Sequence, residues 1–500
     1  MGGKRRCGFS GVRIPGRGRP PAKAAASREE VRNRMAKKTI GRLLKKITSK
    51  KAPPRAKGER GGKQGAPQAW VISVRMGLGH QRASYALEYL TPDGVLNCGE
   101  PETSDPDEMK LWNQLTKTYE TISKMKNVPI IGKTMWNIMN HFLYIPPFYP
   151  LRDLSHPNLQ AKIMRRYIER GLGKKLMEKV QSRPLPVIST YPVPSLVADY
   201  CGHSRNYCVV TDAEINRAWV PIESTTTKTR YFAPCSRALL RLREYGIRDE
   251  QIFLTGFPLP KCLLGSEKLE ILLADLGQRL HHLDPGDQFW PLHGTGVAHF
   301  LGRHNLKLKA KRPFTVAYAV GGAGALWEIG LRAAESLRKN IMSREVRLVL
   351  ICGVREEIYN NYVKGLKDLK IPPGLVDLVY SADTREYFDM FNRQIRVTDV
   401  LWTKPSELVF YAALGLPLIL TEPVGSQEGY NKKWLLEIQG GVNQDDPAYA
   451  NEWLMDLVKL GRLAECAWDG FLKGRKYGTY KIEEVLRTGT MIRESSPLRR

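Results

Sequence analysis

VTDVLWTKPSELVFYAALGLPLILTEPVGSQEGYN, residues 397–431, is the stretch that decides the fold that the sequence predicts. It divides into a buried strand, a short helix from about 405 to 414, a Gly-Leu-Pro turn, a second buried strand and a glycine loop. Two loops, 403–407 and 422–428, therefore follow the ends of successive strands. In open parallel sheets, ligands bind outside the carboxyl ends of the strands. We expect this stretch to form half of a binding site.

The basic charge of the chain is concentrated near its N-terminus. The net charge of the 500 residues is +28, and residues 1–68 contain 21 Lys and Arg against 3 Glu. This composition predicts disorder, because it cannot offset the conformational entropy lost on folding. Apolar residues at helical spacing over 29–50 predict a basic amphipathic helix within the tail. A solvated tail, an anionic membrane surface and an organellar transit role are alternative interpretations, and nucleic acid is a disfavoured partner.

The eight cysteines are scattered, without a CxxC pair or a Cys/His cluster at zinc-ligand spacing. We therefore expect a reducing, cytoplasmic compartment and no metal. No apolar run reaches the roughly 18 to 20 residues that cross a bilayer, and a signal peptide's apolar core is absent. The aromatic, Met-rich segment 128–150 can form a helical hairpin that packs on the protein or dips into a membrane interface. A peripheral position on the inner face of a membrane is thus compatible with the sequence.

The globular part opens with a strand, a glycine loop and a helix. The apolar run 70–74 is followed by the loop RMGLGH, residues 75–80, and by a helix over 81–90. Such a loop leaves backbone N–H groups and the helix dipole available to an anion, although the spacing is not the GxGxxG of dinucleotide sites. Further strands alternate with helices, and Asp212 ends one strand with Trp219 seven residues later. This alternation predicts a doubly wound parallel sheet.

The second half repeats this design. A strand over 313–320 leads into Gly321-Gly322-Ala323-Gly324 and a helix, and further strands are expected at 346–352, 375–380, 395–401 and 417–421. We predict an α/β protein with two doubly wound, Rossmann-like domains facing a cleft. The expected divisions are a basic tail (1–68), an acceptor-binding domain (69–260), a linker or hinge (261–312), a nucleotide-sugar-binding domain (313–450), helices packing back on the first domain (451–486) and a tail (487–500).

The order of these motifs resembles that of the GT-B glycosyltransferases, particularly the monogalactosyldiacylglycerol synthase group and the peptidoglycan N-acetylglucosaminyltransferase. The resemblance covers roughly residues 70 to 485. Segment 77–84 is similar to the Gly-Gly-Gly-His-x-x-Ala loop of the synthases, and segment 210–219 to their Thr-Asp motif and downstream Trp. The other matching segments are 230–236, 256–258, 415–417 and 423–431.

This resemblance implies an inverting, metal-independent transfer of a sugar from a nucleotide diphosphate, UDP-linked, to a lipid or lipid-linked acceptor at a membrane surface, without a cofactor. His80 or Asp212 would act as general base, and Gly77, Gly79 and Trp219 would bind the acceptor. The expected donor contacts are Gly321, Gly322, Gly324, Ser381, Ser406, Glu407, Gly425, Gln427, Glu428 and Asn431.

One departure from the family concerns the ribose contact. The family usually has a carboxylate where this chain has Phe410, and Glu407 lies three residues earlier on nearly the same helix face. Two other functions are also open. A nucleotide-sugar 2-epimerase shares the two-domain fold but needs carboxylates in its cleft, which Asp212 alone fits poorly. A catalytically degenerate sugar-nucleotide-binding or scaffold protein, acting through its basic tail, is the other.

Overall fold

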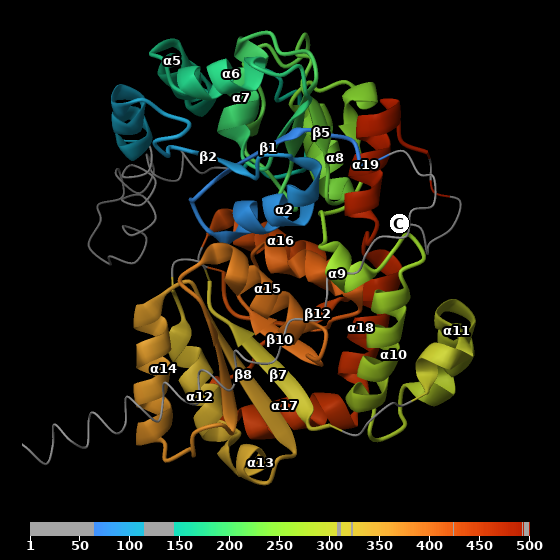
Figure 1. Ribbon diagram of the computed structural model, residues 1–500. Helices are drawn as coiled ribbons and strands as arrows, with labels where there is room; N and C mark the ends of the chain where they lie inside the picture. Colours follow the sequence, from blue (N-terminus) through green and yellow to red (C-terminus); the bar gives the residue numbers. More distant parts are fainter. Residues whose placement is uncertain are drawn as a thin grey trace, which may run out of the picture. The chain divides into compact units, whose positions relative to one another are not determined.

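The computed structural model describes residues 65–114, 145–307, 312–321, 324–423, 425–492, 494 and 500. The predicted amphipathic helix, most of the predicted tail and residues 115–144, which include most of the predicted aromatic hairpin, lie outside this part of the chain. The described residues from 66 onward form one compact unit. It contains two sheets, each of six parallel strands. Helices surround both sheets (Figure 1). The predicted α/β class with two parallel sheets is therefore confirmed.

The first sheet has the strand order β2-β1-β3-β4-β5-β6. Its strands are β1 (Trp70–Val74), β2 (Leu96–Cys98), β3 (Val187–Ser189), β4 (Asn206–Val209), β5 (Arg230–Phe232) and β6 (Ile252–Phe253). The helices between them include α2 (Leu78–Leu87), α5 (Leu159–Glu169), α6 (Lys174–Gln181), α7 (Pro192–Tyr200) and α8 (Ser236–Glu244). Ile72 and Val71, successive residues of β1, are fully buried in two different core clusters. Both faces of the sheet are thus covered, which explains its uniformly apolar strands.

The second sheet has the order β12-β11-β10-β7-β8-β9. Its strands are β7 (Phe314–Ala319), β8 (Val346–Gly353), β9 (Val376–Tyr380), β10 (Val400–Thr403), β11 (Leu418–Leu420) and β12 (Gly441–Asn443). The helical elements are α12 (Trp327–Ser336), α13 (Arg338–Met342), α14 (Glu356–Asp368), α15 (Thr384–Ile395), η5 (Glu407–Leu414) and α16 (Ser426–Glu437). If β7 is counted as the first strand and the sheet is read from the β9 edge, this is the order 3-2-1-4-5-6 of dinucleotide-binding sheets.

Helices account for most of the segment between the sheets. The predicted linker contains α9 (Lys261–Leu264), α10 (Glu270–Leu283), α11 (Trp290–Leu301) and η4 (Arg303–Leu306). Arg279 of α10 is buried and donates to the carbonyl oxygens of Thr398 at 2.8 Å and of Leu414 and Gly415 at 3.0 Å. A single guanidinium therefore ties α10 to both ends of the segment 398–415, which contains the loop 403–407.

The strand predicted over 395–401 was wrong in its start. Residue Ile395 is the last of α15, and β10 begins only at Val400. Thr398 explains the break, because its hydroxyl donates to the Gln394 carbonyl at 2.9 Å and closes the helix end. Two strands, β2 and β12, were not predicted, since three residues are too few to show a periodic pattern.

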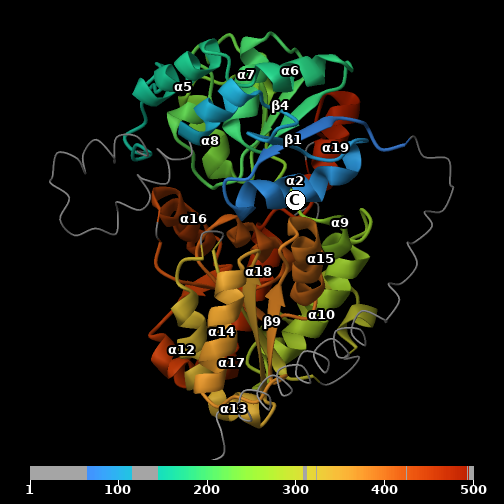
Figure 2. The same ribbon diagram turned by 60° about the vertical axis from the view of Figure 1, so that its left-hand side comes forward.

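The C-terminal region consists of η6 (Pro447–Tyr449), α17 (Ala450–Lys459), α18 (Arg462–Lys473) and α19 (Gly478–Thr488). Ile482 and Val485 of α19 belong to the core cluster that contains Val71 of β1 and Val209 of β4. Figure 2 shows α19 beside these strands, far from α17. The end of the chain thus completes the core of the first sheet.

Candidate functional site

The site lies at the points where the strand order of each sheet reverses. In the first sheet β1 lies between β2 and β3, and in the second β7 lies between β8 and β10. Successive connections leave these strands to opposite sides, and doubly wound sheets bind ligands at such points. The loops concerned are 75–77 after β1, 190–191 after β3, the described residues of 320–326 after β7, and 404–406 after β10.

His80 lies in the first turn of α2, next to the reversal point of the first sheet. Its Nδ1 is 2.7 Å from the carbonyl oxygen of Thr190 and 3.2 Å from Oγ1 of Thr211. A carbonyl oxygen only accepts hydrogen bonds, so Nδ1 carries the proton and Nε2 of the neutral ring is an acceptor. Burial lowers the pKa of His80, although the Thr190 carbonyl and the Glu407 carboxylate act in the opposite direction. The ring is therefore neutral near pH 7, and its Nε2 is a hydrogen-bond acceptor.

Asp212 follows β4, and Asn431 of α16 holds its loop. Asn431 Nδ2 donates to Asp212 Oδ1 at 2.9 Å, and Asn431 Oδ1 accepts from the backbone N–H of Ala213 at 2.7 Å. Burial raises the pKa of Asp212 to about 6 against the Asn431 hydrogen bond, and the carboxylates of Glu407 and Glu428 add to the rise. Such a carboxylate can take up a proton near neutral pH. Asn431, predicted as a donor ligand, also joins a loop of the first sheet to a helix of the second.

Glu407 forms a buried ion pair with Arg82 of α2. Arg82 Nε lies 3.1 Å from Glu407 Oε1, and the two side chains are 2% and 10% exposed. The guanidinium lies over the rings of Phe391 and Phe388, at 4.1 and 5.0 Å, and 3.4 Å separates its Nη2 from the hydroxyl of Tyr387. Removal from water strengthens cation–π contacts. This cluster joins α2 of the first sheet to η5 and α15 of the second, and the ribose contact expected of Glu407 stays a prediction.

Phe410 belongs to an aromatic core. Its ring stacks on Phe257 at 5.4 Å and lies 4.8 Å from the ring of Trp434. The side chain is buried and has no polar atom with which to bind a ribose. The position at which the resembling family has a carboxylate therefore contributes packing in this chain.

Two further predicted donor contacts, Ser381 and Ser406, follow β9 and β10. Ser381 Oγ donates to Glu386 Oε2 at 2.8 Å and accepts from the backbone N–H of Asp383 at 3.1 Å. The backbone N–H of Ser406 donates to the carbonyl of Lys404 at 2.8 Å. Both serines thus stabilise turns at the carboxyl edge of the second sheet.

An ion pair between Lys404 and Glu428 lies next to the loop after β7. Glu428 Oε2 also accepts from the backbone N–H of Gly425 at 3.3 Å. A Cβ on Gly321 would lie 2.3 Å from Lys404 Cε, so the lysine stem rests on that loop. Three predicted donor residues, Gly321, Gly425 and Glu428, are therefore gathered around one cation.

The other predicted glycine-loop residues have separate positions. Gly324 has a φ of 78°, a left-handed conformation that favours glycine. Gln427 lies in the first turn of α16. Gly322 lies outside the described residues.

The predicted acceptor residues surround His80. Gly77 precedes α2 with a φ of 92°, again a conformation that favours glycine. A Cβ on Gly79 would lie 2.9 Å from Glu407 Oε2, so this loop and η5 approach closely. The buried ring of Trp219 is 6.2 Å from the ring of His80. The structure thus brings both predicted bases and the three predicted acceptor residues to one edge of the first sheet.

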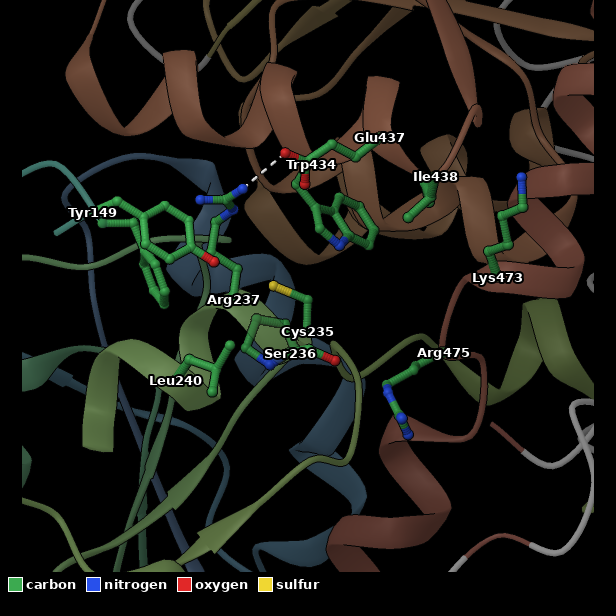
Figure 3. Close-up of a pocket in the computed structure, with 12 residues that line it drawn as sticks. Tyr149, Cys235, Ser236, Arg237, Leu240, Trp434, Glu437, Ile438, Lys473 and Arg475 are labelled. Carbon is green, nitrogen blue, oxygen red and sulfur yellow. Dashed lines mark hydrogen bonds and ion pairs between the residues drawn. The ribbon is translucent and has the colours of Figure 1, made fainter. Parts of the chain in front are cut away.

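A separate cavity of about 330 Å³ lies between α8, α16 and the end of α18 (Figure 3). Its lining combines apolar and cationic side chains, among them Tyr149, Leu240, Trp434, Ile438, Arg237 and Arg475. Two of the lining residues form an ion pair, in which Arg237 Nη2 lies 2.8 Å from Glu437 Oε1. None of the predicted catalytic or donor residues lines this cavity.

Two negative findings apply to the described residues only. Among them, no group of three or more His, Cys, Asp or Glu is arranged to hold a metal ion. No helix in the same part of the chain is long and apolar enough to cross a membrane. The metal-independent reaction and the membrane-surface location stay predictions.

Arg82 and Lys404 were not among the predicted site residues. The partner of Arg82 lies 325 positions further along the chain, and no spacing rule links such distant residues. Lys404 directly follows β10, at the edge of the sheet where ligands bind. A cation at that position could have identified it as a candidate binding residue from the sequence.

No protein-family model and no curated protein matches the chain. Among solved structures, it is similar to MurG of Acinetobacter baumannii, with 12% identity, 84% of this chain and 99% of that chain covered, and a TM-score of 0.44. The glycosyltransferase SsfS6 of Streptomyces sp. SF2575, complexed with thymidine diphosphate, has 11% identity, 84% and 99% coverage and a TM-score of 0.39. UDP-GlcNAc 2-epimerase of Neisseria meningitidis, bound to UDP-GlcNAc, has 13% identity, 71% and 89% coverage and a TM-score of 0.38. These solved structures include a glycosyltransferase and an epimerase, so the reaction of this chain has to be argued from its own residues.

Proposed function

We propose that the protein is a glycosyltransferase that moves a sugar from a nucleotide diphosphate, UDP-linked, to a lipid or lipid-linked acceptor. The observation that carries the proposal is a pair of contacts beside the points where the strand order reverses. Thr211 bonds to His80 within the first sheet, and the neighbouring Asp212 bonds to Asn431 of the second. Both candidate bases lie within electrostatic reach of Glu407, one of the residues expected to bind the donor, which supports the proposal.

The reaction requires a base at the acceptor hydroxyl. The hydroxyl oxygen attacks C1 of the sugar while its proton passes to the base, and the bond from C1 to the diphosphate breaks with its electron pair leaving on the phosphate oxygen. Asp212, with its pKa of about 6, and His80, with an unprotonated Nε2, are the candidate bases. We infer inversion, because a single displacement with a base at the acceptor hydroxyl brings the attacking oxygen to the face opposite the leaving diphosphate.

Release of UDP tests this assignment. We expect the full chain to hydrolyse or transfer at least one of UDP-glucose, UDP-galactose and UDP-GlcNAc, and to be stabilised thermally by it. Asp212→Asn or His80→Ala should lower turnover by about 100-fold or more. Asp249→Asn is a control, because this exposed carboxylate pairs with Arg243 and precedes β6, at the amino ends of the strands and thus away from the proposed site. Unchanged turnover in both site variants would refute the base assignment, and neither binding nor turnover of any donor would refute the enzyme.

The lipid acceptor is supported by two features. The net charge of +18 on residues 1–68 favours an anionic surface. The cavity of Figure 3 combines the apolar side chains of Trp434 and Ile438 with the cation Arg237, which suits an amphiphile with an anionic head. We expect the chain to sediment with phosphatidylglycerol vesicles, and a form lacking residues 1–64 to do so more weakly. Failure of the full chain to bind at low salt would refute this part of the proposal.

One observation favours a second candidate, a nucleotide-sugar 2-epimerase. The carboxylates of Glu407 and Glu428 both raise the pKa of Asp212, so three carboxylates gather near one point. Epimerisation needs groups that remove and return a proton at C2. Incubation with UDP-GlcNAc in D₂O separates the two reactions, because an epimerase exchanges the C2 proton for deuterium, whereas a glycosyltransferase releases UDP.

A further inference from the structure

Lys404 lies across the point where the strand order of the second sheet reverses. It directly follows β10, which pairs in parallel with β7. A Cβ on Gly321, just beyond β7, would lie 2.3 Å from Lys404 Cε and 2.7 Å from its Cδ. The aliphatic stem therefore rests on the backbone of the β7 loop, and a side chain at position 321 would displace it.

A carboxylate holds the ammonium group of Lys404. Its Nζ contacts Glu428 Oε1, and Glu428 Oε2 accepts from the backbone N–H of Gly425 at 3.3 Å. The side chains of Lys404 and Glu428 are 19% and 13% exposed, so water screens the pair weakly. Two charges removed from water in this way carry a desolvation cost. An arriving anion can replace the carboxylate at the ammonium group and leave the lysine neutralised.

The ion pair lies within electrostatic reach of the proposed reaction centre. Lys404 lowers the pKa of Asp212, and Glu428 raises it. Asp212 belongs to the first sheet, whereas both charges belong to the second. A cation on the donor side therefore acts directly on a candidate base on the acceptor side.

We propose that Lys404 binds the diphosphate of the donor and stabilises the negative charge that this group acquires on leaving. This inference rests on the proposed function. When the donor arrives, its β-phosphate oxygens replace Glu428 as acceptors for the ammonium group, and Glu428 becomes available to the sugar hydroxyls. As the bond from C1 to oxygen breaks, the electron pair stays on the diphosphate. The N–H groups of Lys404 then donate hydrogen bonds to it without transferring a proton.

A purely structural salt bridge is the competing explanation. In that case the pair would hold the Gly425 loop near β7, and its loss would weaken all ligands of the second sheet alike through local disorder. A cation that binds the β-phosphate has a narrower effect, because it distinguishes UDP from UMP. The comparison of these two nucleotides therefore separates the explanations.

The experiment is calorimetric titration of the full chain with UDP and with UMP. We expect Lys404→Met to weaken UDP binding by about 10- to 100-fold, since a hydrogen bond to a charged group is lost. UMP binding should fall by less than about 3-fold, and Lys404→Arg should keep UDP affinity within about 5-fold because the charge remains. Lys432→Met is the matched control, because Lys432 also pairs with a glutamate beside this loop, Glu422 at 2.9 Å. It should change neither affinity.

Each outcome decides between the claims. A wild-type chain that binds UDP, with Lys404→Met unchanged or weakened equally for UDP and UMP, overturns the role of Lys404 and leaves the proposed function standing. A folded wild-type chain that binds none of UDP, dTDP, GDP, ADP and CDP overturns the proposed function and this inference together. Circular dichroism checks that the Met variant is folded, and Lys404→Gln provides the same comparison in its place.

Discussion

Replacing Arg82 with Met leaves Glu407 buried without its cation. Breaking a buried pair by removing one partner costs about 3 to 5 kcal/mol in free energy of unfolding, because the remaining charge stays desolvated. The upper part of this range is favoured, since the side chains are only 2% and 10% exposed and the contact is 3.1 Å. Methionine fills much of the same space between Phe391 and Phe388, so most of the loss comes from the unpaired carboxylate and the missing cation–π contacts.

A double-mutant cycle with Glu407→Gln isolates the pair. The Gln side chain is neutral, so the double variant buries no charge at this position. We therefore expect it to be more stable than Arg82→Met alone, with a coupling energy of about 2 kcal/mol or more. Urea unfolding followed by tryptophan fluorescence measures the three free energies, and the slope with denaturant shows whether the compactness of the states has changed.

Arg385→Met is the matched control. Arg385 of α15 pairs with Glu88 at 3.1 Å and thus also joins elements of the two sheets, but the side chains are 69% and 25% exposed. An exposed pair contributes about 0 to 1 kcal/mol. If Arg82→Met costs less than about 1 kcal/mol, or no more than Arg385→Met, the argument that the buried pair couples the two sheets is refuted.

Two further predictions concern the same region. Burial raises the pKa of Asp212 from 3.8 to about 6, so the folded state binds this proton more tightly than the unfolded state. The free energy of unfolding should therefore fall, by on the order of 2 kcal/mol, as the pH rises from about 4 to 6, and Asp212→Asn should remove this fall in urea titrations; parallel pH curves would contradict it. Arg279→Met should cost about 3 kcal/mol in the same assay, because buried carbonyls of the 395–415 segment lose their donor. Arg396→Met, which breaks a partly exposed ion pair, should cost less than about 1 kcal/mol. Equal losses of unfolding free energy in the two variants would contradict the role of Arg279 in holding the 395–415 segment.

The predicted strands were recovered where the apolar pattern was long enough. The runs 313–320 and 346–352 form β7 and β8 almost as predicted. A run of six or more apolar residues is typical of a strand in a parallel sheet that helices cover on both faces. The strand at 395–401 was misplaced, since its first apolar residue closes α15. The loops at the carboxyl ends of the strands, and hence the residues expected in the site, followed from the same local pattern.

The sequence by itself determined the two parallel sheets and the loops that carry His80, Asp212 and Glu428, because hydrophobic periodicity and turn residues act over a few positions. Only the tertiary structure decided which side chains meet across those loops. It paired Glu407 with Arg82, gave the Phe410 position to packing, and laid Lys404 on Gly321. These contacts depend on how separate helices and strands pack, and that packing is set by the burial of whole apolar faces. The spacing of residues along the sequence does not predict it.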